Sequence, residues 1–482
     1  METQYPKYRW FVLVVLFIAI FGSGMVLIAP SPMVQSIYVS IFGTPSHGDT
    51  AGVFAGQVSL MMMVSFTLFT AISGIVSGQI ADRIGVQKTI LLGLILIIIG
   101  AALFMVAGHN IVLLVISRIV MGFGSGPMVT LQAKVASEWF PERQRSLVIG
   151  LGGAALSGGI AVGLNAGQAV YMQTGAQQVF YLQNVATGAI DGANKIFNPG
   201  TVNPALLAQN RLVRVIEGGN WNLAIAVMGI VSILSLILVV IWMNGPKPPQ
   251  VAEPIQAAEG GEHLFAKAVK SAAFPIGILV IFCGSWLLNV INDLTPNHLG
   301  DTFIGLGWGP ANGGTVLSMF SLAYLVGSIV AGILLMTLFR GKYRLHNTIA
   351  FIIGAAVILM VIMPQFVNPN PAQPGMPPAP LIVAMIVAGF FMSMPIVIVQ
   401  AFVANNYPKQ LTGRIGGMSM GIGFLGGTVG VAVSSMTLVA TGHYDLSIII
   451  VSIASVIGAI LGIWLKRPKA FAEEEAAKIA DK

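Results

Sequence analysis

The chain has 482 residues, of which 56% are hydrophobic and only 9% are charged, and its formal net charge is +7. A soluble protein would carry roughly a quarter charged residues, so this composition excludes a soluble globular class and indicates that most of the surface faces lipid. The single cysteine, Cys283, lies in an apolar run, which excludes an intramolecular disulfide.

Windows of about 20 apolar residues predict membrane-spanning helices. The first window is longer than the apolar part of a signal peptide, so we interpret it as the first span. It ends in Ala29-Pro-Ser-Pro32, which predicts a bent or unwound outer end. We expect an all-α membrane protein with twelve transmembrane helices, centred in 10–35, 53–77, 89–108, 111–137, 146–170, 221–243, 272–296, 312–338, 346–364, 381–404, 413–440 and 446–465.

Basic residues mark alternate connections between these spans. Twenty of the 24 lysines and arginines lie in the tails or near the connections that follow even-numbered spans. The other four are Arg118, Lys195, Arg211 and Arg214. Positive residues are enriched on the cytoplasmic side, so we expect both termini there, in a multi-pass protein of the plasma (inner) membrane. The positive charge is therefore a topology signal, and we expect no nucleic-acid partner.

A polar linker divides the spans into two sets of six. We expect an N-terminal six-helix bundle over 1–244, a cytoplasmic linker over 245–270, a C-terminal six-helix bundle over 271–466 and a cytoplasmic tail over 467–482. The external loop 171–220 is too long for an ordinary connection, so we expect either a partly structured cap or a flexible segment.

The connection between spans 2 and 3 is short and charged. It reads GQIADRIGVQK over residues 78–88, and a loop this tight makes the two spans antiparallel neighbours. Asp82 and Arg83 must lie at a membrane face, because a charge at the bilayer centre costs about 2.5–3.5 kcal/mol. Asp82 also precedes span 3 closely enough to favour its exposed N–H groups. It either acts only as this cap or also pairs with a cytoplasmic arginine, for which Arg143 and Arg145 are the candidates.

Arg118 is the deepest unambiguous charge in the sequence. It lies about seven residues into span 4, roughly 10 Å along a helix that rises 1.5 Å per residue. Ser125 and Gln132 follow at seven-residue spacing, so all three lie on one face that we expect to line a cavity. Two roles stay open for Arg118. It binds an anion or controls a nearby proton-carrying group, or it is a structural arginine bonded to carbonyls of the broken first span.

Span 7 carries a second polar face. Ser285, Asn289 and Asn292 share this face, and Trp286 and Asp293 lie beside it. Asp293 is the acidic residue most plausibly inside a span, which makes it the candidate for proton coupling. Because it lies near the outer end, an interfacial aspartate without a function is the alternative.

Two further amides are weaker candidates for lining a solute site. Asn165 lies near the outer end of span 5, and Gln400 lies in span 10. Hydrogen bonds between helices are an equally good explanation for both.

The two halves contain matching sequence patterns. WFPER (139–143) precedes the glycines 150–159, and NYPKQ (406–410) precedes a glycine-rich run in which Gly417 and Gly426 fall on Gly150 and Gly159. The 78–88 segment also has a faded copy, LFRGKYR (338–344), with leucine in place of the aspartate. Repetition at matched positions favours an internal duplication over simple helix packing.

These motifs resemble those of the major facilitator superfamily. Residues 78–88 match its loop 2–3 motif except that Gln87 replaces the first basic residue, RIVMGFG (118–124) resembles its second motif, and WFPER is common among its organic-anion and metabolite carriers. The resemblance implies two pseudo-symmetric six-helix bundles with a substrate site between them and transport by alternating access. It also implies a latch between the halves in the outward-facing state, formed by Gly78, Asp82, Arg83, Gly85, Lys88, Arg143 and Arg145.

The resulting hypothesis is a monomeric secondary carrier for a small organic solute, with an organic anion favoured by Arg118 and by the start of span 5. Proton symport and exchange both stay open. The sequence has no Walker loop, metal-spaced His/Cys cluster or nucleophile elbow, so we expect neither an enzyme nor a cofactor or metal. The rival hypotheses are a proton-coupled exporter of amphipathic compounds and a non-transporting membrane sensor.

Overall fold

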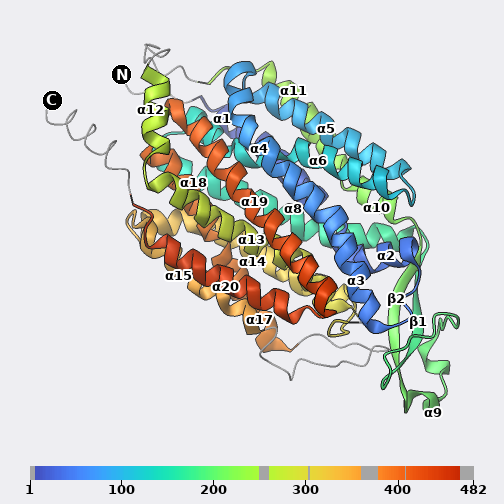
Figure 1. Cartoon of the computed structure of the whole chain (residues 1–482). Helices are drawn as coiled ribbons and strands as arrows, with labels where there is room; N and C mark the ends of the chain where they lie inside the picture. Colours follow the sequence, from blue (N-terminus) through green and yellow to red (C-terminus); the bar gives the residue numbers. More distant parts are fainter. Residues whose placement is uncertain (1–5, 249–259, 302–303, 360–377, 408, 467–482) are drawn as a thin grey trace.

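The computed structural model describes residues 6–248, 260–301, 304–359, 378–407 and 409–466. Long helices run side by side along one direction, and a β-hairpin projects from one end of the bundle (Figure 1). We call this end the hairpin end. The opposite end, where the first helix begins and the last helix finishes, is the terminal end.

The first half of the chain builds one set of helices and the hairpin. The helices are α1 (Arg9–Ile28), α2 (Val34–Phe42), α3 (Gly48–Ser59), α4 (Ser65–Ile84), α5 (Val86–Val106), α6 (Ile111–Thr130), α7 (Gln132–Trp139), α8 (Glu142–Gln173), α9 (Pro204–Leu207), α10 (Trp221–Val227) and α11 (Ile230–Met243). The strands are β1 (Ala176–Asn184) and β2 (Asn210–Gly218). Short 3-10 or π turns are η1 (Ser31–Met33), η2 (Leu60–Val64) and η3 (Pro199–Thr201).

The second half builds the other set. Its elements are α12 (Gly260–Val269), α13 (Ala273–Gly300), α14 (Pro310–Met336), α15 (Tyr343–Gly354), η4 (Ala355–Ile358), α17 (Ala379–Met392), α18 (Met394–Asn406), α19 (Lys409–Thr441) and α20 (Asp445–Gly462).

Eleven helical segments of the described chain are long and apolar enough to cross a membrane. The ninth predicted span, 346–364, corresponds to α15 and η4 over Tyr343–Ile358, and its last residues lie outside the described residues. The predicted all-α membrane fold is therefore confirmed. The tail 467–482 and much of the linker 245–270 also lie outside the described residues, so these boundaries stay predictions.

α5 shows why the composition is so apolar. Ile90, Leu94 and Ile97 are fully buried on one side of this helix, whereas Leu92 and Ile99 on other sides are 51% and 48% exposed. A helix that is hydrophobic all round and yet half exposed is typical of a membrane span, in which the outward side chains contact lipid.

The tight connection predicted between spans 2 and 3 is confirmed. α4 ends at Ile84 and α5 begins at Val86, so a single residue, Gly85, joins them. Gly85 has φ +92°, a backbone conformation that side-chain-bearing residues rarely adopt. This explains physically why the motif has glycine at this position.

The first span is broken where the prolines predicted it. α1 ends at Ile28, and η1 and α2 continue the chain in a new segment. Pro30 has no N–H to offer the carbonyl of Val26, four residues earlier, so that oxygen needs another hydrogen-bond donor.

The long loop 171–220 is structured. β1 and β2 pair antiparallel from Ala176 opposite Gly218 to Asn184 opposite Asn210. On its exposed side, Lys195 Nζ lies 2.6 Å from Glu217 Oε2, and this hydrogen bond and the carboxylate charge raise the pKa of Lys195. Of the two alternatives left open for this loop, the structure shows a structured segment, and the two-stranded sheet is an addition to the all-α fold.

The hairpin contacts both halves. Ser36 of α2 donates a hydrogen bond to the Ile216 carbonyl at 2.8 Å. Arg214 of β2 lies against Gly309, just before α14, where any Cβ would overlap the guanidinium. The hairpin therefore bridges the two sets of helices at the hairpin end.

The matched glycines have equivalent packing roles. A Cβ at Gly159 would lie 2.0 Å from the Phe21 carbonyl oxygen of α1, and a Cβ at Gly426 would lie 2.0 Å from the Phe282 carbonyl oxygen of α13. α1 and α13 are the first spans of the two halves. The duplication inferred from the sequence thus appears in the structure as the same helix contact made twice.

Alanine at either Gly159 or Gly426 is expected to destabilise the protein by about 1–3 kcal/mol, because the methyl group forces two helix backbones apart. Gly416→Ala is the matched control, since its Cβ would make an ordinary 3.5 Å contact with Ala133 Cβ. Thermal unfolding of the purified variants measures the difference. Melting of G159A and G426A at the temperature of G416A would contradict this packing role.

Candidate functional site

The two halves meet along two pairs of spans. α3 and α4 run against α19, and α8 runs against α14. Near the terminal end, a Cβ on Gly78 would lie 2.8 Å from the Gly413 carbonyl oxygen, and toward the hairpin end a Cβ on Gly56 would lie 2.8 Å from that of Ser435. The halves are therefore in backbone contact at both ends of their interface.

Three small cavities lie between the halves, with volumes of about 20, 10 and 20 Å³. Gln132 and Gln400 line the one nearest the terminal end. Asn289, Asn292 and Asp293 line the one nearest the hairpin end. The middle cavity shares lining residues with both. Each has room for about one water molecule, so these three cavities, as the described residues form them, are too small for an organic solute in this conformation.

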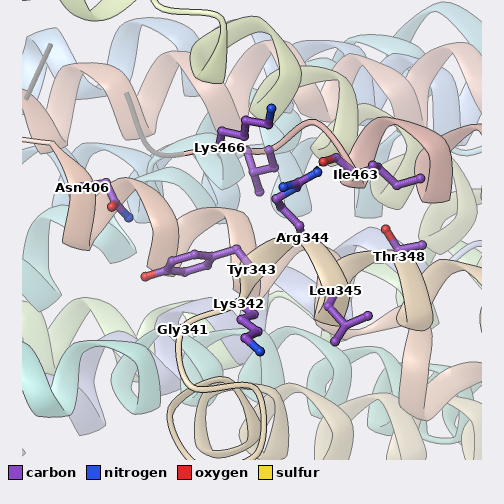
Figure 2. Close-up of a pocket in the computed structure, with 10 residues that line it drawn as sticks. Gly341, Lys342, Tyr343, Arg344, Leu345, Thr348, Asn406, Ile463 and Lys466 are labelled. Carbon is purple, nitrogen blue, oxygen red and sulfur yellow. Dashed lines mark hydrogen bonds between the residues drawn. The ribbon is translucent and has the colours of Figure 1, made fainter. Parts of the chain in front are cut away.

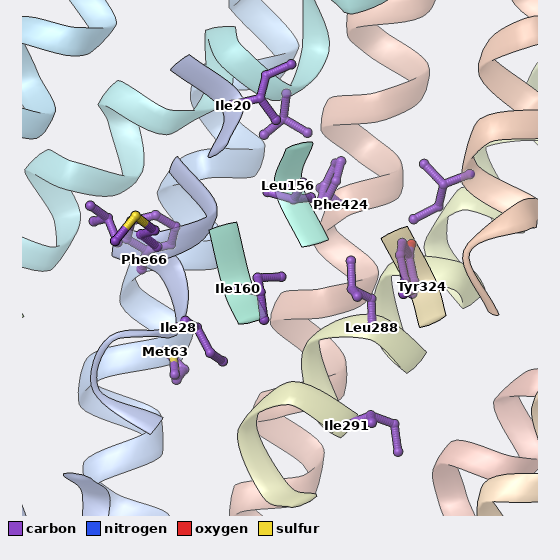
Figure 3. Packing of buried hydrophobic residues seen from close by; sticks show 14 of the residues in the cluster. Ile20, Ile28, Met63, Phe66, Leu156, Ile160, Leu288, Ile291, Tyr324 and Phe424 are labelled. Atoms are coloured by element: carbon purple, nitrogen blue, oxygen red, sulfur yellow. The ribbon is translucent and has the colours of Figure 1, made fainter. Parts of the chain in front are cut away.

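The cavities lie along a path between the halves, and the middle of this path is apolar. Leu156, Leu288 and Phe424 lie where the cavities adjoin, and Tyr324 lies beside Leu288 (Figure 3). These side chains come from α8, α13, α19 and α14 and are buried. An apolar centre with amide groups on each side suits a small molecule that has a hydrophobic body and polar ends.

Several buried polar atoms along the path have no hydrogen-bond partner among the described residues. They include both side-chain polar atoms of Asn292, Oδ2 of Asp293 and Oε1 of Gln400. An unsatisfied buried polar group costs about 1–3 kcal/mol, so such atoms need an explanation. Asn292 and Asp293 lie at the cavity nearest the hairpin end, and Gln400 lies at the one nearest the terminal end.

Arg118 is held by backbone carbonyls. Its Nε donates to Met62 at 2.9 Å, Nη1 to Val26 at 2.8 Å and Nη2 to Leu27 at 3.0 Å. Val26 and Leu27 belong to the last turn of α1, and the Val26 carbonyl is the one that Pro30 leaves without a donor.

The guanidinium also lies 4.4 Å from the centre of the Phe66 ring. A cation at a helix C-terminus is favourable, and an aromatic face adds to the attraction. This arrangement fits the structural role considered for Arg118, and Arg118 does not line any of the three cavities.

The other two residues of this face of span 4, Ser125 and Gln132, have different surroundings. The span breaks at Leu131, where α6 ends and α7 begins. Gln132 lines the cavity nearest the terminal end and packs against Gly152 of α8. Ser125 is fully buried, lines none of the three cavities, and its Oγ has no partner in the described part of the chain.

Three predicted lining residues hold helices together instead. Asn165 Nδ2 donates to Ser318 Oγ at 2.6 Å, which joins α8 to α14 across the interface. Ser285 Oγ accepts from the Gly427 N–H at 3.2 Å, and Trp286 packs against Gly430, so both join α13 to α19. The alternative of hydrogen bonding between helices is thus the one that the structure shows for Asn165.

Asp293 is buried between the two halves. Its Oδ1 accepts from Ser59 Oγ of α3 at 3.4 Å, and its backbone carbonyl accepts from Ser31 Oγ at 3.2 Å. The described residues provide no ion-pair partner for its carboxyl group. An ionised carboxylate without a cation is costly in such surroundings.

At the terminal end, Asp82 pairs with a residue that the sequence did not single out. Lys134 of α7 donates to Asp82 Oδ1 and lies 4.0 Å from Glu138. Asp82 thus has Lys134 as an ion-pair partner in this conformation, and its pairing with Arg143 or Arg145 stays a prediction. The side chain of Arg143 lies outside the described side chains.

The Asp82–Lys134 pair packs against α19 of the second half. A Cβ on Gly413 of α19 would lie 2.9 Å from Lys134 Cδ and 3.5 Å from Asp82 Oδ1. Arg145 crosses to the second half separately, since its Nη1 donates to the Ala404 carbonyl at 3.3 Å. Arg83, Gly85 and Lys88 are exposed on the same end. The role of this cluster as a latch stays a proposal.

Asp82→Asn is expected to leave membrane insertion intact and to impair transport, because it weakens the surface on which α19 closes. An exposed ion pair contributes about 0–1 kcal/mol, so we expect up to about a fivefold loss of uptake rate. Lys134→Gln should give the same defect, and the double variant should be no worse than either single one. Wild-type uptake by normally expressed D82N would contradict the latch.

Sequence reasoning missed several residues of the path. Thr67 and Thr70 line the middle cavity, while Tyr324 and Ser328 line the one nearest the terminal end. Thr67 and Thr70 are polar residues three apart in an apolar span, a signal that was available. Tyr324 gives no such signal, because a tyrosine in a span is more often an interfacial anchor.

A family model described as Major Facilitator Superfamily matches residues 12–190 and 276–481. The 4-hydroxybenzoate transporter PcaK of Pseudomonas putida is 24% identical over 462 residues, which cover 90% of this chain and 87% of that protein. The hexuronate transporter of Bacillus subtilis (strain 168) is 31% identical over 119 residues, 24% of this chain and 28% of that protein.

Solved structures share the fold. A D-xylose-proton symporter superposes with a TM-score of 0.65 at 15% identity, covering 95% of this chain and 98% of that one. A human organic anion transporter superposes with a TM-score of 0.60 at 13% identity, covering 95% of this chain and 100% of that one.

Proposed function

Because the chain belongs to the major facilitator superfamily, we propose that it is a secondary active transporter that moves a small organic anion across the plasma membrane by alternating access. Two relatives support this substrate class, since 4-hydroxybenzoate and hexuronate are both carboxylates. The structural observation that carries the proposal is the group of unpartnered polar atoms of Asn292, Asp293 and Gln400 in the path between the halves.

The path suits a carboxylate with an apolar body. Leu156, Leu288 and Phe424 would contact the body, while amides on either side would hydrogen-bond the polar ends. Among the described residues that line the three cavities there is no lysine or arginine. The anion would therefore meet amide dipoles rather than a free cation.

This electrostatic situation favours proton symport over exchange. A proton carried on Asp293 would neutralise its carboxyl group, so a proton and a monoanion would cross together without net charge. The Asp293 carboxyl group accepts a hydrogen bond from Ser59 across the interface at the hairpin end, so its protonation would alter the contact that must open there.

The orientation follows from the basic residues. They are enriched at the terminal end, which we therefore propose to be cytoplasmic, with the hairpin outside. The Gly78–Gly413 contact would then close the cytoplasmic side, and the Asp82–Lys134 pair would support that closure.

One observation favours a second candidate function. A buried carboxylate with no cationic partner, next to an apolar path, also suits a hydrophobic cation that pairs with Asp293. The protein would then be a proton-coupled exporter of amphipathic compounds, in which the solute and the proton compete for one carboxyl group.

A ligand-stabilisation screen separates the two. Thermal unfolding of the purified protein is measured with aromatic carboxylates, hexuronates, amino acids and hydrophobic cations. We expect carboxylates to stabilise the wild-type protein. Gln400→Leu should weaken this stabilisation, whereas Asn244→Leu, a substitution at an exposed residue, should leave it unchanged. Stabilisation by hydrophobic cations alone would support the exporter and contradict the anion carrier.

A further inference from the structure

A large cavity lies at the terminal end, away from the path between the halves. Its volume is about 680 Å³, and it is formed where α15 begins and where α18 and α20 end. It is lined by Gly341, Lys342, Tyr343, Arg344, Leu345, Thr348, Asn406, Ile463, Leu465 and Lys466. The proposed transport cycle uses none of these residues.

The charged lining residues of this cavity are all basic. Lys342, Arg344 and Lys466 line it, and Figure 2 shows Arg344 and Lys466 extending next to each other. Arg344 Nε donates to the Ile463 carbonyl, so this side chain is anchored at the cavity wall. No aspartate or glutamate is among the described lining residues. A site with three cations and no acid suits a ligand with negative charge.

The start of α15 adds backbone donors to the same site. Lys342 is the N-cap residue of this 12-residue helix, whose first turn opens at the cavity. The N–H groups of a first turn favour anions, and phosphate groups in particular. They supplement the three side-chain cations.

The surroundings place the cavity at the edge of the membrane. Leu338, Leu345, Ile463 and Trp464 have exposed fractions of 70%, 50%, 43% and 57%. Apolar side chains this exposed on a spanning protein face lipid, and tryptophan prefers the level of the lipid headgroups. The basic residues therefore lie where the hydrocarbon ends, within reach of a headgroup whose acyl chains follow the apolar surface.

The duplication explains how such a site arose. Residues 341–344 of the faded copy of the charged loop line the cavity, and Leu338 in the same copy occupies the position equivalent to Asp82. In the first half, Asp82 neutralises the nearby Lys134. The second copy has leucine in place of the acid and keeps one basic residue, Arg344 at the position of Lys88, while Lys342 stands where the first copy has Val86.

We propose that this cavity binds the headgroup of an anionic phospholipid, with Lys342, Arg344 and Lys466 contacting the phosphate. A basic pocket between spans at the cytoplasmic face matches the leaflet in which anionic lipids attract basic residues. The site is separate from the solute path, so the proposal does not depend on the transported substrate.

Native mass spectrometry of the full-length protein with phosphatidylglycerol tests the proposal. A basic residue beside an anionic lipid contributes about a fivefold gain in affinity, so the triple variant K342Q/R344Q/K466Q should bind about 100-fold more weakly. The single variant K466Q should lose about fivefold. Thermal unfolding without lipid shows whether the triple variant folds. If it does not fold, the single variant K466Q still tests the site.

The matched control is K7Q/K247Q/K270Q, which removes three exposed basic residues of the same end. It should retain phosphatidylglycerol binding, and phosphatidylcholine should bind more weakly than phosphatidylglycerol to the wild type. Equal losses in both triple variants would overturn the site in favour of general charge attraction. Binding of soluble glycerol phosphate as tightly as the lipid would overturn the lipid headgroup as the ligand.

Discussion

Arg118→Met is expected to lower the free energy of unfolding by about 3 kcal/mol or more, because it leaves three buried carbonyl groups without donors. These carbonyls belong to Val26, Leu27 and Met62, and the guanidinium reaches all three at once. Arg118→Lys should recover only part of the lost stability, since a compact ammonium group cannot reach all three carbonyls as the planar guanidinium group does. Chemical or thermal unfolding of the purified variants gives the measurement.

Arg83→Met is the matched control for this substitution. Arg83 is exposed in the last turn of α4, so its loss should cost less than about 1 kcal/mol. A stable R118M protein that folds like R83M but no longer binds carboxylates would contradict the structural role and restore Arg118 as an anion-binding residue.

Asp293→Asn is expected to abolish uphill uptake driven by a pH gradient while preserving exchange of solute across the membrane. Asparagine resembles the protonated aspartate in shape and cannot release a proton, so the transport cycle would run without proton movement. With one proton per monoanion, a one-unit pH gradient sustains about a tenfold solute gradient. The variant should instead equilibrate the solute.

Accumulation in proteoliposomes with an acidic exterior measures this effect. Asp445→Asn is a suitable control, because Asp445 is an exposed carboxylate at the start of α20. Tenfold accumulation by D293N would exclude Asp293 as the proton carrier, and loss of both exchange and accumulation would indicate a structural role.

The membrane fold could be predicted because hydropathy, proline and glycine act locally. The break after Ile28 follows from two prolines, and the joint at Gly85 follows from the tight charged loop. The hairpin was not predicted as strands, because VFYL in β1 and LVRVI in β2 are short and no tight turn joins them. Their pairing depends on contacts with α2 and α8 that the sequence pattern does not contain.

The site could be predicted only in part. The sequence singles out Asn289, Asn292, Asp293, Gln132 and Gln400 because each is a polar residue in an otherwise apolar span, and these residues line two of the small cavities between the halves. Their part in solute binding or proton coupling stays a prediction. The roles of such residues depend on which helices lie opposite.

Two residues illustrate this limit. Arg118 contacts carbonyls of α1 and η2, a role that the sequence left open beside anion binding. Asp82 contacts Lys134, which the break at Leu131 places at the start of the separate helix α7. Neither choice follows from spacing along the chain, since each partner comes from a different helix that only the fold brings close.

Counterflow of a labelled carboxylate in proteoliposomes tests the central claim most directly. The carboxylate is one that stabilises the purified protein, and vesicles are loaded with the same compound unlabelled. We predict saturable uptake above that of protein-free vesicles, accelerated by the internal compound, because both faces would share one site between the halves. Binding of the carboxylate without any protein-dependent flux would contradict a carrier.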